Sequence, residues 1–218
     1  GVILEDLGRF EEAEASYRLA ITLKYDYPEA HYNLGITLDQ LGKSEEAETS
    51  YKKAIDLKPD YAEAHYNLGI TLNQLGKSEE AETSYKKAID LKPDYAEAHT
   101  HLGTTLQELG RLEDAEASYR AAIALKYDHA QAHSNLGIIL YIRGDIDSSI
   151  ESLKKAKYID PNLESNKIIL SILLAKKTQR KLGFTEGYAN AIRSSDVSSE
   201  KLLAPFFASR AVEEELIT

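Results

Sequence analysis

The sequence contains no cysteine, methionine or tryptophan among its 218 residues. Without cysteine the chain forms neither disulfides nor thiolate metal sites, and it tolerates any redox environment. No apolar run approaches the roughly 20 residues that a membrane-spanning helix requires. The first residues also lack the basic stretch and the long apolar core of a signal peptide. We therefore expect no membrane partner and, on this basis, a cytoplasmic location.

Basic side chains are outnumbered, with 26 Lys and Arg against 36 Asp and Glu and a net charge of −10. Affinity for nucleic acids comes mainly from neutralising phosphates with basic side chains, so we expect no nucleic-acid partner. An acidic surface instead favours neutral or basic protein partners over partners with acidic tails. The hydrophobic content of 43% and the charged content of 28% are ordinary for a globular protein.

A repeat of 34 residues organises most of the sequence. Residues 62–95 copy residues 28–61 with only two changes, Pro28 to Ala62 and Asp39 to Asn73. Residues 96–129 and 130–163 are looser copies, and residues 1–27 match the end of an earlier one. Because the first copy is incomplete, we expect the chain to be a fragment of a longer array.

Each copy has the pattern of two helices separated by a glycine. In residues 28–61, Leu34, Leu38 and Leu41 are spaced as one apolar face of a helix. Gly42 supplies the left-handed residue that ends such a helix. We expect Ser44 to cap the N-terminus of the second helix.

A second glycine recurs inside the first helix of every copy, where it costs roughly 1 kcal/mol relative to alanine. We expect this cost to be offset by close approach of the paired helix, with a small residue opposite. The glycines are Gly35, Gly69, Gly103 and Gly137, and the expected partners are Ala47, Ala81 and Ala115. The fourth copy differs, with Ser149 at the alanine position and Leu153 in place of a tyrosine.

A unit of this length with Gly, Ala and Pro at fixed offsets resembles the tetratricopeptide repeat, over about three quarters of the chain. The resemblance implies an all-α, right-handed superhelix of antiparallel helix pairs. The expected array covers residues 1–163, as a partial repeat 1–27 and full repeats 28–61, 62–95, 96–129 and 130–163. Residues 164–181 keep helical periodicity and are expected to form a capping helix, because a solenoid must cover its last exposed face. We expect residues 182–218 to form a helical extension or a linker.

Histidine recurs once per repeat, which favours a packing role over a metal site. One zinc ion needs all its ligands at about 2 Å, whereas stacked helices lie about 8–10 Å apart. Paired carboxylates also recur in every copy, although a catalytic pair is needed only once. No nucleophile motif or phosphate-binding loop is present. We therefore expect no metal, no cofactor and no enzymatic activity.

Asparagine occupies the sixth position of the first helix at Asn33, Asn67 and Asn135, with His101 in the third copy. An asparagine amide offers a donor and an acceptor, the complement of one peptide unit. In the tetratricopeptide family this helix lines the concave groove, and the pattern resembles the asparagine ladder of the O-linked N-acetylglucosamine transferase superhelix. His101 breaks the resemblance. The alternative is that asparagine is simply common at this exposed position. The candidate peptide-binding residues are Asn33, Asn67, His101, Asn135, Tyr32 and Tyr66.

The carboxylate clamp of chaperone-binding relatives needs basic residues at the second, fifth and sixth positions of the first helix. The second position here is Glu29, Glu63, Glu97 or Gln131, so the clamp is absent. The resemblance thus implies a scaffold that binds a protein or an extended peptide in its concave groove. Two alternatives stay open: a self-assembly module that meets other copies through its solenoid ends or concave faces, and the targeting arm of a larger enzyme whose catalytic domain is missing.

Overall fold

The computed structural model describes residues 1–163, 170, 171, 173, 174 and 177. Over this part of the chain the structure has ten α-helices and no strand, which confirms the predicted all-α solenoid. The helices are α1 (Val2–Asp6), α2 (Phe10–Leu23), α3 (Pro28–Gln40), α4 (Ser44–Leu57), α5 (Ala62–Gln74), α6 (Ser78–Leu91), α7 (Ala96–Glu108), α8 (Leu112–Leu125), α9 (Ala130–Ile142) and α10 (Ile146–Ile159). The predicted extension over 182–218 lies outside the described residues, and so does most of the predicted capping helix over 164–181.

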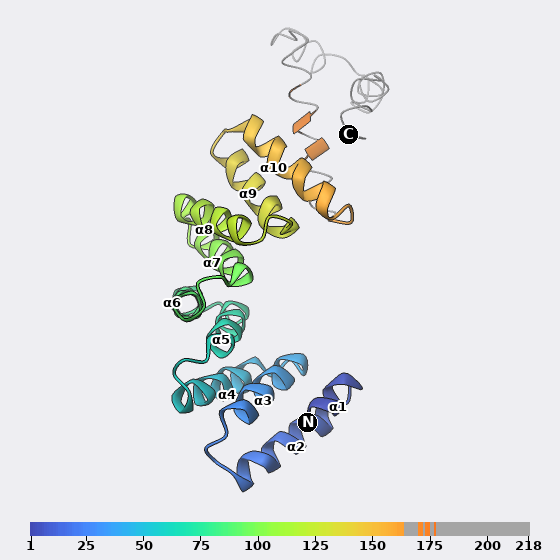
Figure 1. The fold of residues 1–218 in the computed structure, drawn as a ribbon, viewed down its shortest axis with the longest axis vertical. Helices are drawn as coiled ribbons and strands as arrows, with labels where there is room; N and C mark the ends of the chain where they lie inside the picture. Colours follow the sequence, from blue (N-terminus) through green and yellow to red (C-terminus); the bar gives the residue numbers. More distant parts are fainter. Residues whose placement is uncertain (164–169, 172, 175–176, 178–218) are drawn as a thin grey trace, which may run out of the picture. The chain divides into compact units, whose positions relative to one another are not determined.

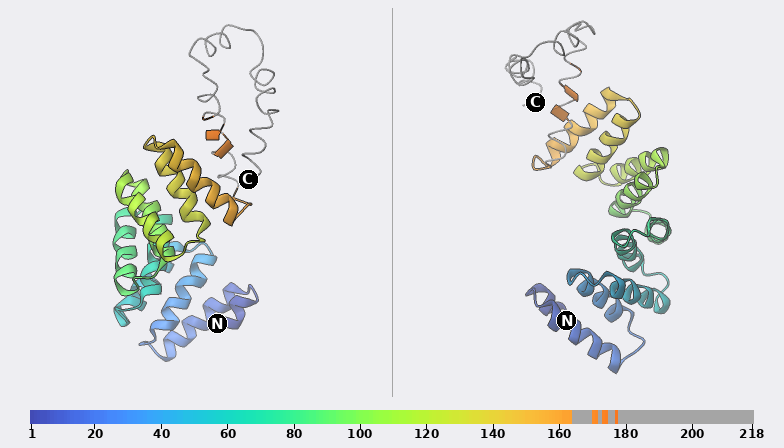
Figure 2. Two further views of the ribbon diagram at one scale, coloured as in Figure 1. Left: turned by 45° about the horizontal axis from the view of Figure 1, so that its top comes forward. Right: turned by 180° about the vertical axis from the view of Figure 1, so that it is seen from behind.

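The chain divides into two units, Gly1–Asn135 and Leu136–Thr218. In the first unit each helix contacts the next one in sequence, and α5 also contacts α3 and α7, the first helices of the neighbouring repeats. The stack in this unit curves, with α5 on the inner side and α6 on the outer side (Figures 1 and 2). The first helices α3, α5 and α7 therefore form one continuous surface, which we call the first-helix face.

The turn between α3 and α4 is built on Gly42, whose φ of +71° is a left-handed conformation. The amide of Lys43 donates to the Leu38 carbonyl at 2.8 Å across this turn, which closes the end of α3. Lys43 is also the N-cap of α4, because its carbonyl accepts from the Ala47 amide at 2.9 Å. The prediction that Ser44 caps α4 is therefore wrong. Ser44 is the first helical residue, and no side chain caps this helix.

In repeats 28–61, 62–95 and 96–129 the glycine inside the first helix faces an aromatic ring. A Cβ added to Gly35 would lie 2.6 Å from Cε1 of Tyr51, far inside contact distance. The ring of Tyr51 is almost completely buried and occupies the space above the glycine. The paired helix approaches closely, as predicted, and the atoms nearest to Gly35 come from Tyr51 rather than from Ala47. Ala47 is fully buried, but it is Tyr51 that requires glycine on the partner helix.

Ion pairs join the second helix of one repeat to the loop that begins the second helix of the next. The Nζ atom of Lys77 lies 2.8 Å from Oε2 of Glu48, and Nη1 of Arg111 lies 2.8 Å from Oε1 of Glu82. The carboxylates are mostly covered while the cations are about half exposed, so each pair contributes no more than about 1 kcal/mol. These pairs align successive repeats rather than supply most of the stability.

In the second unit α10 packs against the Leu136–Ile142 part of α9. A Cβ on Gly137 would lie 2.6 Å from Cγ of Leu153, which here replaces the tyrosine of the other repeats. The hydroxyl of Ser149 donates to the Gly137 carbonyl at 2.7 Å. Leu153 belongs to an apolar cluster completed by Ile150, Leu170, Leu173 and Leu174.

None of the helices in the described part of the chain combines the length and the apolar character that crossing a bilayer requires.

Candidate functional site

The recurring histidines bond to the backbone of the preceding loop. The Nε2 atom of His65 lies 3.1 Å from the Pro59 carbonyl oxygen, and that of His133 lies 2.9 Å from the Tyr127 carbonyl oxygen. Burial lowers the pKa of His65, which favours the neutral ring. The described residues contain no group of three or more His, Cys, Asp or Glu side chains placed to hold a metal ion. These contacts support the predicted packing role.

Asn67 is the predicted ladder residue whose amide bonds to a neighbouring repeat. Its side chain is half-buried on the first-helix face, and its Nδ2 donates to the hydroxyl of Tyr32 at 3.1 Å. Tyr32 comes from the preceding repeat, so this hydrogen bond joins α3 to α5. The side chain of Asn33 is half-buried and forms no side-chain hydrogen bond within the described residues.

The other two predicted ladder positions are engaged within the protein. The Oδ1 atom of Asn135 accepts from Gln131 at 2.7 Å, and its Nδ2 lies 3.4 Å from the hydroxyl of Thr104. His101 stacks on the ring of Tyr85, with centroids 5.8 Å apart and ring planes at 21°. Burial lowers the pKa of His101, which favours the neutral form of the stacked ring.

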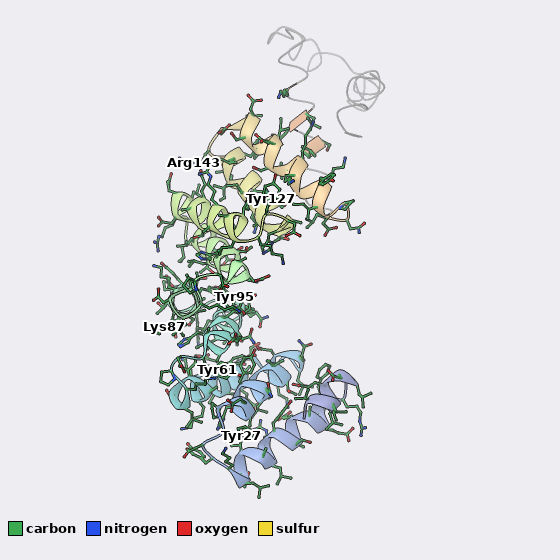
Figure 3. All side chains as sticks on the ribbon, in the orientation of Figure 1. Tyr27, Tyr61, Lys87, Tyr95, Tyr127 and Arg143 are labelled. Carbon is green, nitrogen blue, oxygen red and sulfur yellow. The ribbon has the colours of Figure 1, made fainter. Side chains whose placement is uncertain are left out.

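Tyrosine rings run beside these amides from repeat to repeat. Tyr32 packs on Tyr61 with centroids 4.8 Å apart, and Tyr66 packs on Tyr95 at 4.7 Å. Figure 3 shows Tyr61 and Tyr95 following one another along the stack. Burial is the main cause that raises the pKa of both Tyr61 and Tyr66 to about 12, so their hydroxyls stay protonated at neutral pH. Tyr32 and Tyr66, the two tyrosines predicted to contact a peptide, therefore both pack against a tyrosine within the protein.

Sequence reasoning missed a polar position near the end of each first helix. The carboxylate of Asp39 accepts two hydrogen bonds at its Oδ2 atom, from the Tyr51 hydroxyl at 3.0 Å and from the Thr71 hydroxyl at 2.8 Å. Tyr51 belongs to the same repeat and Thr71 to the next, so Asp39 joins the two. Burial is the main cause that raises the pKa of this carboxyl above its ordinary value.

The same position in neighbouring repeats is satisfied differently. Glu5 accepts with both oxygens, from Tyr17 at 2.9 Å and from Thr37 at 2.5 Å. Asn73 donates from its amide nitrogen to Thr105 at 2.7 Å. A signal for this position was available in the sequence, because Asp39 to Asn73 is one of only two differences between the near-identical repeats.

A cavity of about 250 Å³ opens on the first-helix face between α3 and α5. Its aliphatic walls come from Ile36 and Ile70, and its polar groups come from Asp39, Gln40, Asn67 and Gln74. Tyr51 of α4 also lines it. This cavity brings the predicted Asn67 together with the unpredicted Asp39.

Carboxylates occupy the position where a clamp would place basic residues, and some of them form ion pairs. The Nζ atom of Lys126 lies 3.4 Å from Oε1 of Glu97, and Nζ of Lys92 lies 3.9 Å from Oε1 of Glu63. All four side chains are about half exposed. The pairs reduce the local negative charge without converting the position into a basic one.

Comparison with known proteins identifies the repeat. A family model described as "TPR repeat" matches residues 1–42, 38–76 and 71–110, and one described as "Tetratricopeptide repeat" matches residues 100–164. The chain belongs to the tetratricopeptide repeat family. Members of this family are typically scaffolds rather than enzymes. No curated protein matches the sequence closely enough to count as a relative.

Several solved tetratricopeptide structures have the same fold. A crystal structure of MamA is 26% identical, with a TM-score of 0.69 over 72% of this chain and 92% of that one. YrrB, described as a TPR protein with an unusual peptide-binding site, is 25% identical, with a TM-score of 0.66 over 75% and 84%. TTC0263 from Thermus thermophilus, described as a thermophilic TPR protein, is 27% identical, with a TM-score of 0.60 over 80% and 95%.

Proposed function

We propose that this chain is an interaction scaffold that holds an extended peptide, or an extended segment of a protein, on its first-helix face between α3 and α5. The observation that carries the proposal is the cavity between these helices, which Asn67 helps to line. Membership of the tetratricopeptide family and the peptide-binding site named for YrrB support it.

The asparagine amides supply hydrogen bonds that suit a peptide backbone. The Nδ2 of Asn67 already donates to Tyr32, while its Oδ1 accepts no hydrogen bond within the described residues. That oxygen is therefore placed to accept from a peptide N–H. Asn33, one repeat away, offers both a donor and an acceptor. Two amides at repeat spacing fix the direction of a bound strand with little regard for its side chains.

The proposed site is shorter than the ladder predicted from the sequence. Asn135 already bonds to Gln131 and Thr104, so a peptide must displace those contacts to reach it. His101 offers a ring edge rather than an amide, because its face lies on Tyr85. We therefore place the main contacts at Asn33 and Asn67, with secondary contacts from Tyr32, Tyr66, His101 and Asn135.

The partner is expected to be neutral or basic. Glu29 is exposed beside the site, and Glu63 retains about half its side-chain exposure despite its ion pair. A peptide with a cluster of carboxylates would meet these acids and gain no basic contact to offset the repulsion.

The test is a peptide array screened with the wild-type chain, followed by titration of Asn67→Ala against the best hit. Loss of one neutral hydrogen bond should weaken binding by about 0.5–1.5 kcal/mol. Thr83→Ala is the matched control, because Thr83 is exposed on α6 and bonds only to its own helix. A best hit that binds Asn67→Ala as tightly as the wild type contradicts the proposed site.

Self-association is the second candidate, because α1, its C-cap residue and α2 expose a set of large apolar side chains. These are Val2, Ile3, Leu7, Leu19 and Leu23, each more than half exposed. Exposed apolar surface of this kind often marks contacts between proteins. Light scattering across a range of concentrations separates the two functions: a stable oligomer without peptide binding favours self-assembly.

A further inference from the structure

We propose that the cavity between α3 and α5 receives a lysine side chain of the bound segment, and that Asp39 pairs with its ammonium group. The inference rests on the proposed function, because it concerns a side chain of the same peptide. It adds a specificity residue that neither the repeat pattern nor the family resemblance assigns.

The first ground is the unfinished hydrogen bonding of Asp39. Its Oδ2 accepts from Tyr51 and Thr71, but no group in the described part of the chain donates to its Oδ1, which is almost inaccessible to solvent. Asp39 also forms no ion pair among the described residues. A buried carboxylate without full compensation is costly, so a cation that arrives with the ligand gains more here than at the surface.

The second ground is the shape and lining of the cavity. Ile36 and Ile70 present aliphatic walls, and Gln40 and Gln74 are exposed amides at its edge. A lysine side chain fits such a lining, because its hydrocarbon stem packs on apolar walls and its charged end needs an anionic partner. The stem would lie between the isoleucines and direct the ammonium group toward Asp39.

The third ground separates lysine from arginine. A guanidinium group binds a carboxylate best through two parallel hydrogen bonds, which require both oxygens. Oδ2 of Asp39 is already shared by two hydroxyl donors, so only Oδ1 is available. An ammonium group is a compact charge that one oxygen satisfies. Oδ1 is almost inaccessible to solvent, so the bound segment must displace the side chains that cover it before the ammonium group reaches this oxygen.

The neighbouring repeats act as internal comparisons. Glu5 has both oxygens occupied by Tyr17 and Thr37, and Asn73 carries no charge. Among these equivalent positions only Asp39 combines a carboxylate with an unpartnered oxygen beside a cavity. We therefore expect a lysine subsite at Asp39 and none at Asn73, although the two repeats are almost identical in sequence.

The experiment is a positional array of N-acetylated, C-amidated nonapeptides in which one residue is Lys, Arg, acetyl-lysine or norleucine. It is screened with the wild type, Asp39→Asn and Asp56→Asn. Asp39→Asn places in this repeat the residue that the next repeat carries, so the fold is preserved. Asp56→Asn removes the same charge from the exposed side of α4 and controls for the general attraction of an acidic protein to basic peptides.

The expected result is a preference for Lys at one peptide position, with about tenfold weaker binding of acetyl-lysine, in the wild type and in Asp56→Asn. Asp39→Asn should bind the two peptides equally. Peptides that bind without a Lys preference, or a preference that persists in Asp39→Asn, overturn the lysine subsite and leave the scaffold function intact. If the wild type prefers Arg and Asp39→Asn loses that preference, the ligand side chain is arginine and the proposal of lysine is wrong. If no peptide binds the wild type, the proposed function fails and the subsite fails with it.

Discussion

Gly69 lies directly against the ring of Tyr85, and a Cβ at this position would stand 2.7 Å from Cε1 of the ring. Tyr85 is fully buried, so its ring cannot move aside. The contact repeats at Gly35 with Tyr51 and therefore sets the distance between the two helices of a repeat.

Gly69→Ala should destabilise the protein by about 1–3 kcal/mol, the usual cost of overpacking a tight core. Helix propensity alone would change the free energy of unfolding in the opposite direction, because it favours alanine over glycine by roughly 1 kcal/mol inside a helix. Chemical denaturation measures the change. The control is the pair Lys86→Gly and Lys86→Ala at an exposed position of α6, where alanine should be the more stable. A Gly69→Ala variant that gains stability would show that the ring yields.

Ala81→Leu should also destabilise the array by about 1–3 kcal/mol. Ala81 is fully buried, so a larger side chain has no free space to occupy. The atoms nearest to Gly69 come from Tyr85, so the prediction depends on the burial of Ala81 itself. Thr83→Leu, an exposed change on the same helix, should leave the denaturation midpoint nearly unchanged. Equal midpoints for the wild type and Ala81→Leu contradict the prediction.

Asp39→Asn should stabilise the chain at neutral pH. Burial raises the folded-state pKa of Asp39, so the carboxyl holds its proton more tightly in the folded than in the unfolded chain. Its contribution to stability is present below the unfolded pKa near 3.8 and is lost as pH rises through the folded value. The advantage of Asp39→Asn over the wild type should therefore shrink as pH falls toward about 3.5. Thermal unfolding at several pH values measures it, and a variant less stable than the wild type at pH 7 refutes it.

The fold could be predicted because the same pattern of leucines and glycines recurs in several repeats. Leu34 and Leu38 mark the buried stripe, and Gly42 marks the left-handed turn, which the structure places at φ +71°. The role of Ser44 could not be read in the same way. Serine is common both at the cap and just inside a helix, and the glycine turn decides which residue becomes the cap.

The candidate site was less predictable because it depends on which side chains meet across two repeats. The sequence placed Asn67 on the first-helix face, but not its hydrogen bond to Tyr32 of the preceding repeat. Spacing alone also could not show that His101 would stack on Tyr85. Asp39 differs from its equivalent Asn73 in the sequence, yet only the contacts with Tyr51 and Thr71 show why that difference bears on function.

Stability should also fall as the pH is lowered from about 7.5 to 5.5, because the histidines pack in their neutral form. Burial is the main cause that lowers the pKa of these rings below the ordinary value of 6.5. A depressed pKa means that the unfolded chain binds the proton more tightly than the folded one. The contribution is therefore present above about pH 6.5 and is lost as pH falls through the folded-state pKa. The rings concerned are His31, His65, His99, His101 and His129.

Glutamates with basic partners titrate outside this window. Glu48 and Glu82 have pKa values lowered below 4.5 by their basic partners, so their stabilisation is lost only at more acidic pH. Thermal unfolding between pH 7.5 and 5.5 therefore reports mainly on the histidines. His65→Gln removes one titrating ring and should reduce the slope of stability against pH in this range. A wild-type midpoint that does not change between these pH values, or a slope that His65→Gln leaves unaltered, would show that the packed histidines do not resist protonation.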